Sequence, residues 1–428
     1  MAKRRVNKNS RAYKRRKRRR NRRILFAVEL VVLLLVAGAL FVFAYMNRQM
    51  GKVNQQELDL GNVGVNEGAL EASQNELKGT QLIALVGLDS RLDVAENASE
   101  DSENSDTMIL ACIDNDNKQI RLCSVFRDTY MNTFEYGDMT SDYFTKANAA
   151  YAYGGAEQML TMMNKNLDLN ITDYATVNFS ILTQVIDLLG GLDLDMTREE
   201  AIHLNNYNVE TAAASGVEYV EVEIPSEEVF DGAKTMTFHL NGSQSVSYAR
   251  IRKTEGGDFR RAARQRLLIQ KIFEKVKGLA TDLTTLNSIF DTVCPQVTTS
   301  MQASDMWKLG LALLTYDMGE QAGFPFTHVE DQDIIDSMGS DYVVPVTLAT
   351  NVTQLHNFLY PGIPYTMSET VQEYSNVISE DSGYYESDIP TTSETGEIPT
   401  YNEAEDPNMN GSAADTADYT DTVGEDYE

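Results

Sequence analysis

A long basic run followed at once by a long apolar run is the feature that most constrains this chain. Residues 1–23 contain fourteen lysines and arginines and no acidic residue, and residues 24–46 read ILFAVELVVLLLVAGALFVFAYM. About 20 apolar residues suffice to cross the hydrocarbon core of a bilayer, and Glu29 is the single charge in this stretch. The pattern predicts one transmembrane helix over 24–46, retained as an anchor because a cleaved signal peptide has a shorter apolar core.

The charges on either side of this helix predict its orientation. Positive flanks stay in the cytoplasm, so residues 1–23 form a basic cytoplasmic head of a single-pass protein of the cell membrane, and the rest lies outside. Of the 36 basic residues, 22 remain beyond the head, against 64 acidic residues in the chain. Such an acidic part disfavours nucleic-acid partners. The head itself has two interpretations, a nucleic-acid-binding arm or an orientation signal attracted to anionic lipids, and its position favours the second.

Composition divides the exported part into three segments. Residues 47–78 are polar and contain glycine, which is typical of an extracellular stalk. Residues 79–365 are long enough for one domain with a full core. Residues 366–428 are acidic and have tyrosine as almost their only large apolar type, which predicts a disordered tail.

Short apolar runs alternate with helical patterns in the central segment. Strands are predicted at LIALV (82–86), TMILACID (107–114), QIRLCSV (119–125) and 174–179, and helices at 147–167 and SILTQVIDLLGG (180–191). The turn-rich NDNK between the second and third strands predicts a hairpin. This mixture indicates an α/β domain with helices packed on a sheet.

The cysteines and histidines exclude several kinds of site. Cys112, Cys123 and Cys294 are too few for a disulfide scaffold or a zinc ribbon, and the four histidines show no metal-ligand spacing. In the predicted hairpin, paired residue numbers sum to about 235, which sets Cys112 opposite Cys123. A disulfide and two buried free thiols are both compatible with that placement.

Charged residues at strand ends are the first candidates for chemistry. Asp89 and Arg91 follow the strand at 82–86, where α/β sheets hold ligands, although an aspartate after glycine is also an ordinary turn residue. The hairpin register places Asp106 beside Arg127, Asp128 and Thr129 at its open end. The simpler interpretation of that pair is a cross-strand ion pair.

The segment YARIRKTEGGDFRRAARQRLLIQKIFEKV is the most informative. Asp258 is a good N-cap for a helix, and one stripe of that helix carries Arg261, Arg264, Gln265, Leu268 and Ile272. Because the apolar end of the stripe must face the core, its basic end also points inward. With Arg250, Arg252 and Lys253 just upstream, this helix N-terminus suits a phosphate, and nearby carboxylates would hold Mg²⁺. The alternative is a solvated basic face, which the alignment with the apolar stripe disfavours.

Several stretches together resemble the LytR–CpsA–Psr family of cell-wall glycopolymer ligases. They are LIALVGLDSR, SDTMILACID, LCSVFRDTY, KANAAYAYGGAEQML, DLLGGLDLDM and LNGSQSVSYARIRKTEGGDFRRAARQR, in family order across residues 81–275. The resemblance implies an αβα sandwich with a mixed central sheet and an apolar groove for a prenyl chain. It also implies a Mg²⁺-dependent phosphotransferase that moves a glycopolymer (teichoic acid, capsule or another polysaccharide) from a polyprenyl-pyrophosphate carrier to peptidoglycan through a phosphodiester.

The resemblance carries site roles onto matching positions of this sequence. It implies Asp89 and Asp106 as metal ligands. It implies Asp89, Arg127, Arg250 and Arg252 as catalytic residues, Arg91, Lys146, Arg261, Arg264 and Gln265 as substrate-binding residues, and Asp128 and Asp258 as supporting residues. Two departures stand out. Asn104 occupies a position where the family commonly has arginine, and the loop 92–104 is long and acidic.

Two other functions use the same residues. A surface pyrophosphatase would employ water as the acceptor, and a non-catalytic binder or regulator would hold the lipid-linked polymer without a reaction.

Overall fold

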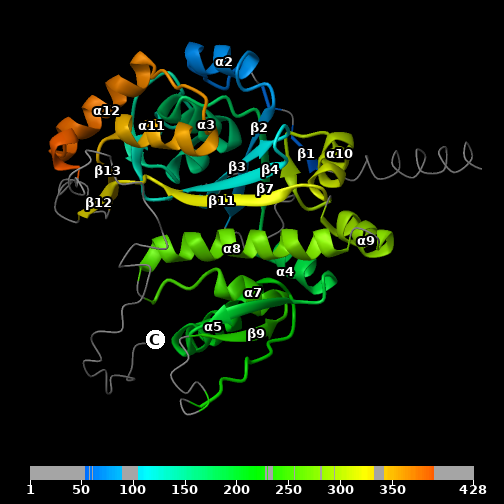
Figure 1. Cartoon of the computed structure of the whole chain (residues 1–428). Coiled ribbons are helices and arrows are strands. Elements are labelled where there is room, and N and C mark those ends of the chain that lie inside the picture. The colour runs from blue at the N-terminus through cyan, green and yellow to red at the C-terminus, as the bar shows by residue number, and fades with distance from the viewer. Residues whose placement is uncertain are drawn as a thin grey trace, which may run out of the picture. The chain divides into compact units, whose positions relative to one another are not determined.

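A seven-stranded sheet forms the centre of this protein in the computed structural model, which describes residues 54–56, 58–59, 61–88, 105–226, 229, 235–254, 256–279, 282–293, 295–331 and 342–389 (Figure 1). In spatial order its strands are β1 (Asn54–Gln55), β10 (Thr298–Thr299), β7 (Asp173–Val177), β2 (Thr80–Leu88), β3 (Ser105–Asp114), β4 (Gln119–Val125) and β11 (Asp317–Phe324). β2 pairs antiparallel with β3 and parallel with β7, and β4 pairs parallel with β11. The predicted α/β fold with a mixed central sheet is confirmed.

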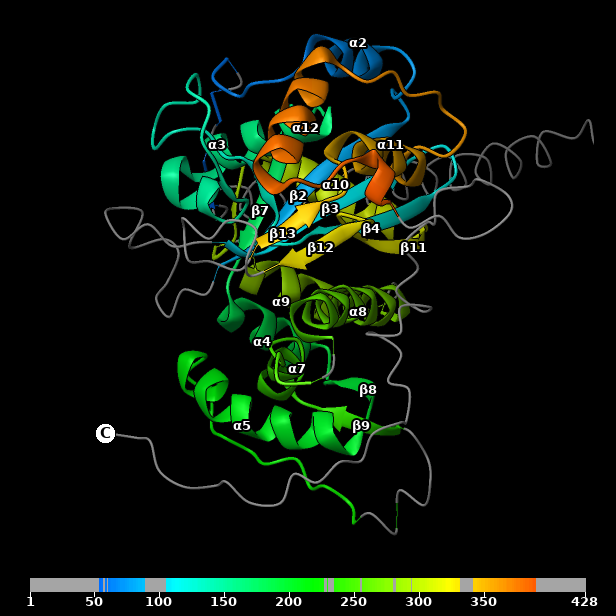
Figure 2. The ribbon, with the colours of Figure 1, turned by 90° about the vertical axis from the view of Figure 1, so that its left-hand side faces the viewer.

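Helices cover both faces of this sheet (Figure 2). One face packs against α3 (Ala149–Leu167), α11 (Leu348–Leu359) and α12 (Glu369–Ser382), and the other against α8 (Gly257–Gly278) and α10 (Ala303–Leu313). The run LIALV is apolar without alternation for this reason, since Ala84 and Ile83 enter the cores on opposite faces.

A further group of elements lies beyond α8 and has its own core (Figure 1). It contains α4 (Phe179–Leu188), β8 (Leu192–Met196), α5 (Arg198–Ala214), β9 (Met236–Leu240) and α7 (Gly242–Tyr248). The remaining elements are α2 (Glu67–Gln74), β5 (Tyr130–Asn132), β6 (Phe144–Lys146), α9 (Leu283–Val293), β12 (His328–Asp331), β13 (Tyr342–Pro345) and the short 3-10 helix η1 (Glu386–Asp388).

The β3–β4 hairpin forms as predicted, but its register differs by two residues. Cys112 lies opposite Arg121, and Cys123 lies opposite Leu110. The prediction that the two cysteines face one another is therefore wrong, because NDNK is the four-residue loop between the paired Asp114 and Gln119, and its centre lies one residue earlier than the predicted numbering assumed. Both thiols are free and buried, and burial raises the pKa of each to about 12.

The predicted stalk and tail boundaries are wrong at their inner ends. Residues 54–55 of the predicted stalk (47–78) pair with β10, and Val63 is buried. The predicted tail (366–428) begins with α12, in which Val371 and Ile378 are both 0% exposed. Val371, Tyr374 and Ile378 repeat at helical spacing, a signal that the acidic composition of this segment masked.

The buried carboxylate of Asp168 joins the first and last parts of the domain. It accepts hydrogen bonds from the Asn66 amide, from Tyr365 Oη (2.5 Å), and from the backbone nitrogen (2.9 Å) and hydroxyl (2.6 Å) of Ser368. These contacts connect the segment before α2, the end of α3 and the start of α12.

We expect Asp168→Ala to lower the free energy of unfolding by about 3 kcal/mol, because it leaves the buried Asn66 amide and the partly buried donors of Tyr365 and Ser368 without an acceptor. Denaturant unfolding of the full chain measures this. Asp138→Ala removes an exposed carboxylate and serves as the control; equal losses for the two variants would contradict the expectation.

The predicted transmembrane helix at 24–46 and the head at 1–23 lie outside the described residues. Within the part that is described, every helix is too short or too polar to cross a bilayer.

Candidate active site

Charged side chains meet where the open end of the β3–β4 hairpin faces the start of α8. Asp106 is the second residue of β3, and Arg127 and Asp128 follow the last residue of β4. Arg252 belongs to the loop that precedes α8, and Arg261 lies in the first turns of that helix. Three segments that are distant in sequence thus converge at one end of the hairpin.

The carboxylate of Asp106 is surrounded by three guanidinium groups. Nη1 of Arg127 donates to its Oδ1 at 2.7 Å, and Nη2 of Arg252 donates to its Oδ2 at 3.2 Å. Nη2 of Arg261 donates to the Asp106 backbone oxygen at 3.1 Å. The predicted placement of Asp106 beside Arg127 is confirmed by the hydrogen bond between their side chains.

Asp258 is the second carboxylate of this arginine cluster, which we define as Asp106, Arg127, Arg252, Asp258 and Arg261. Its Oδ2 accepts a hydrogen bond from Nη2 of Arg261 at 3.0 Å. It lies 3.6 Å from Nε of Arg127, and its Oδ1 lies 3.5 Å from Nε of Arg252. Asp258 is in the first turn of α8, but the N-cap is Gly256, whose left-handed backbone (φ 81°) starts the helix.

Burial and neighbouring charges shift the pKa values of Asp258 and Arg127. Desolvation raises the pKa of Asp258, although the guanidinium groups of Arg127 and Arg252 act in the opposite direction. For Arg127, burial alone would lower the pKa, but the carboxylates of Asp258, Asp128 and Asp106 raise it. Arg127 is therefore charged at any physiological pH.

Two buried polar atoms of the cluster have no hydrogen-bond partner among the residues that the structure describes. They are Oδ1 of Asp258 and Nε of Arg261. Buried polar atoms without partners are costly, so such a pair marks a place where a further polar group can bind. A phosphate oxygen suits the free N–H of Arg261.

Lys146 and Asp128 extend the cluster on one side. Nζ of Lys146 lies 3.2 Å from Oδ1 of Asp128 and 5.5 Å from the centre of the Tyr342 ring. Asp128 Oδ2 also accepts a hydrogen bond from Nε of Arg127 at 3.2 Å. Lys146 is therefore connected to the arginines through one carboxylate.

Arg264 and Arg250 make their contacts elsewhere. Both Arg261 and Arg264 are 3% exposed, which confirms that this stripe points inward. The guanidinium of Arg264, however, binds Oε1 of Glu200 at 2.9 Å and the backbone oxygen of Ile251 at 2.9 Å.

Arg250 donates to the Thr211 hydroxyl at 2.8 Å and to Oε2 of Glu210 at 3.2 Å, both on α5. The described structure thus brings together Asp106, Arg127, Asp128, Lys146, Arg252, Asp258 and Arg261, and directs the side chains of Arg250 and Arg264 to α5. Gln265 is half-buried, one turn along α8 from Arg261. Asp89 and Arg91 lie outside the described residues.

The family of this chain follows from a direct match. The model of the LytR_cpsA_psr family matches residues 42–354. This chain belongs to that family.

Two curated relatives and one solved structure illustrate the likeness. A polyisoprenyl-teichoic acid–peptidoglycan teichoic acid transferase of Halalkalibacterium halodurans is 30% identical over 228 residues, which are 53% of this chain and 63% of that protein. A transferase of the same description from Bacillus subtilis is 27% identical over 275 residues, 61% of this chain and 60% of that one. These matches span about three fifths of each relative's length. A Streptococcus agalactiae protein solved by crystallography shares the fold at TM-score 0.51 with 21% identity, covering 70% of this chain and 94% of that one.

Sequence reasoning missed two residues that support the elements around the arginine cluster. Glu200 is buried on α5, where it closes a capping box with Thr197 and binds Arg264. The spacing of Thr197 and Glu200 is the usual sign of such a box, so the sequence did carry a signal. Arg266 is 0% exposed and donates to the Ser124 hydroxyl of β4, which attaches α8 to the sheet.

Only one of the two residues predicted to hold magnesium in this LytR–CpsA–Psr domain can be placed. It is Asp106, because Asp89 is outside the described residues. Among the residues that can be inspected, no three side chains of His, Cys, Asp or Glu form a group able to hold a metal. The carboxylate oxygens present, including Oδ1 of Asp258 without a hydrogen bond, are of the type that Mg²⁺ prefers.

Proposed function

We propose that this chain is an extracytoplasmic phosphotransferase that moves a glycopolymer from a polyprenyl-pyrophosphate carrier to peptidoglycan through a phosphodiester. The convergence of Arg127, Arg252 and Arg261 on Asp106 is the observation that carries this proposal. A diphosphate presents oxygens to several guanidinium groups at once, and such charge-assisted pairs are strong in a partly buried site. The names of the two transferases described above support the same reaction.

The proposed reaction forms one bond to phosphorus and breaks another. The oxygen of an acceptor hydroxyl attacks the phosphorus that bears the glycopolymer, and the bond from that phosphorus to the bridging oxygen breaks. The polyprenyl monophosphate leaves, and the glycopolymer is joined to the acceptor by a phosphodiester. Arg127, Arg252 and Arg261 position the diphosphate and neutralise the charge that develops on its oxygens.

The acceptor proton needs a base, and we assign this role to Asp258. Its Oδ1 is free of hydrogen bonds, and burial gives the carboxylate a raised pKa and hence a stronger affinity for a proton. Asp106 is less suited, because both of its carboxylate oxygens accept hydrogen bonds from arginines, whereas Oδ1 of Asp258 accepts none.

We propose Asp89 and Asp106 as the residues that hold Mg²⁺. Bound there, the ion would supply further charge neutralisation at the phosphates. We propose Arg264 as a residue that positions Arg252 rather than one that touches the substrate, since it binds the backbone of Ile251 and the hydroxyl of Thr254 on either side of that arginine. The contacts of Arg250 with α5 suggest a similar positioning role.

The prenyl chain needs an apolar surface near the arginines. The core between the sheet and α3 is rich in methionine, with Met108, Met131, Met159, Met162 and Met163 all at most 1% exposed. Methionine side chains are adaptable, so we propose that this layer opens to form the groove that the family resemblance implies.

We expect Asp258→Asn to lower kcat/KM about a hundredfold at neutral pH and to flatten its dependence on pH on the acidic side. In the unaltered protein, the base acts only when ionised, so activity falls as the pH drops through the raised pKa of Asp258, above the usual value of about 4. Rates between pH 4 and 8 measure this. Asp305→Asn, at an exposed position of α10, is the control. An unchanged acidic limb in Asp258→Asn would exclude Asp258 as the base.

Incubation of the full chain with a prenyl-pyrophosphate-linked glycan, peptidoglycan and Mg²⁺ tests the proposed function. We expect a glycan–peptidoglycan product that is lost in Arg252→Ala. Phosphate release without that product would favour the pyrophosphatase, and binding without either reaction would favour a regulator.

We further propose that residues 24–46 anchor the chain with residues 1–23 in the cytoplasm. Protease treatment of intact spheroplasts tests this topology. It should degrade the domain, and removal of the basic head should disturb the orientation. Unchanged orientation without the head would contradict the proposal.

A further inference from the structure

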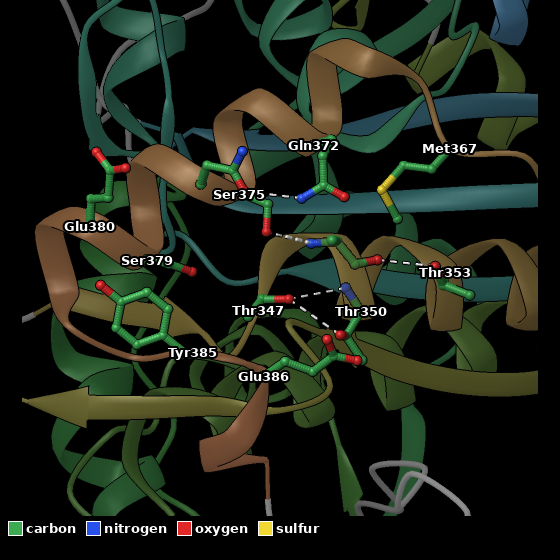
Figure 3. Close-up of a pocket in the computed structure, with 12 residues that line it drawn as sticks. Thr347, Thr350, Thr353, Met367, Gln372, Ser375, Ser379, Glu380, Tyr385 and Glu386 are labelled. Atoms are coloured by element: carbon green, nitrogen blue, oxygen red, sulfur yellow. Dashed lines mark hydrogen bonds between the residues drawn. The ribbon is translucent and has the colours of Figure 1, made fainter.

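A pocket of about 500 Å³ lies between α11 and α12, apart from the arginine cluster (Figure 3). Side chains of α11 form one wall, and α12 with the following residues forms the other. Its lining includes Thr350, Thr353, Gln372, Asn376, Ser379 and Tyr385. Hydroxyl and amide groups both donate and accept hydrogen bonds, so this wall is suited to a ligand with many hydroxyls.

Several of these polar groups already have defined positions. The hydroxyls of Thr347 and Thr350 lie 3.2 Å apart, and the amide of Gln372 donates to Oδ1 of Asn376 at 3.1 Å. Tyr385 is 51% exposed, so part of its side chain is accessible to a ligand. An exposed ring beside hydroxyls and amides is the combination that binds a sugar, whose apolar face packs on the ring while its hydroxyls pair with polar side chains.

The charge of the pocket favours uncharged saccharides over anionic ones. Glu380 and Glu386 line it, and no lysine or arginine is among its described lining residues. A polymer with phosphate in its backbone is repelled by these carboxylates, whereas an uncharged sugar chain is not. The pocket therefore fits an uncharged acceptor glycan better than a phosphate-containing polymer such as a teichoic acid.

A short series of contacts connects the pocket with the arginine cluster. Asp381, next to Glu380, accepts a hydrogen bond from Tyr130 Oη at 3.0 Å. The ring of Tyr130 packs on that of Tyr342 at 5.2 Å, and Tyr342 contacts Lys146, the partner of Asp128.

The distance between the pocket and the arginine cluster can be estimated from the number of residues between them. Thr347 lines the pocket and follows Val343 by four residues, and Val343 pairs with Thr129 beside Asp128. At the rise of an extended chain, four residues span about 13 Å. A glycan held in the pocket can thus reach the cluster with its next few sugar units.

We propose that the α11–α12 pocket is a subsite for the uncharged sugar backbone of the acceptor glycan, a chain of N-acetylated hexosamines. This inference rests on the proposed function, which makes peptidoglycan the acceptor. The subsite holds the strand while a hydroxyl further along it enters the arginine cluster.

Calorimetric titration of the full chain with a β-1,4-linked N-acetylglucosamine tetramer tests the subsite. We expect saturable binding, with Kd raised at least tenfold in Tyr385→Ala and in Asn376→Ala. The matched control is Tyr219→Ala, which removes a ring that is 41% exposed on a different part of the domain and should leave Kd unchanged. Melting temperatures confirm that each variant is folded.

Absence of tetramer binding would overturn the subsite, as would equal effects of Tyr385→Ala and Tyr219→Ala. Displacement of the tetramer by a glycerol-phosphate oligomer would overturn its preference for an uncharged chain. A transfer assay on the same preparations separates the two proposals. Tyr385-dependent binding without transfer contradicts the proposed reaction and leaves the subsite intact, whereas transfer with binding insensitive to Tyr385 contradicts the subsite alone.

Discussion

Arg261→Ala is expected to lower kcat/KM for glycan transfer by about a thousandfold or more. The side chain of Arg261 is 4% exposed and contacts both carboxyl-bearing residues of the cluster, Asp106 through its backbone and Asp258 through Oδ2. Removal of this guanidinium deletes a positioned positive charge from a partly buried site, where water replaces it poorly. Formation of the glycan–peptidoglycan product measures the loss.

Two further substitutions sharpen this test. Arg261→Lys keeps the charge but loses the planar fork, so we expect an intermediate activity. Lys271→Ala removes a cation from a more exposed position of the same helix and should retain nearly full activity. A loss of less than tenfold in Arg261→Ala, or a loss equal to that of Lys271→Ala, would show that the cluster does not bind the transferred phosphate.

Glu200→Ala is expected to destabilise the fold by about 3–5 kcal/mol, because it leaves Arg264 as a buried cation without its carboxylate. Oε1 of Glu200 accepts hydrogen bonds from Nε (3.1 Å) and Nη2 (2.9 Å) of Arg264, and Oε2 caps the backbone nitrogen of Thr197 at 2.8 Å. Both functions disappear in the variant. Denaturant unfolding measures the effect.

The same substitution should also reduce transfer, since Arg264 holds the loop that carries Arg252. Glu199→Ala is a close control, because its side chain is 65% exposed on the same turn of α5, and it should change little. In a double-mutant cycle, Arg264→Met should recover part of the stability lost in Glu200→Ala. Additive losses in the cycle would mean that the two side chains do not act as a pair.

Local patterns predicted the strands and helices well. The continuous apolar run 82–86 and the hairpin at 107–125 were readable because burial on both faces of a sheet demands apolar residues at every position. The apolar stripe of α8 also predicted that Arg261 points inward, since a helix rotates its side chains at a constant angle per residue.

The hairpin register is a feature that local sequence patterns could not predict. A two-residue shift keeps every side chain on its face, so the alternation of residues cannot distinguish the two pairings, and Cys112 was placed opposite the wrong partner. The predicted boundaries of the domain were wrong for a related reason. The edge strand β1 and the helix α12 are stabilised by distant residues such as Thr298 and Asp168, which composition cannot reveal.

The sequence by itself determined the family, the α/β class, the inward-facing stripe of α8 and the residue types of the site, because these depend on periodicity and on motifs within short segments. Only the tertiary structure decided which arginines share a carboxylate. The motif contains four arginines that its sequence does not distinguish. Arg252 and Arg261 contact Asp106, whereas Arg250 and Arg264 bind residues of α5. Those partners lie on other elements, and long-range packing alone sets the distance between them.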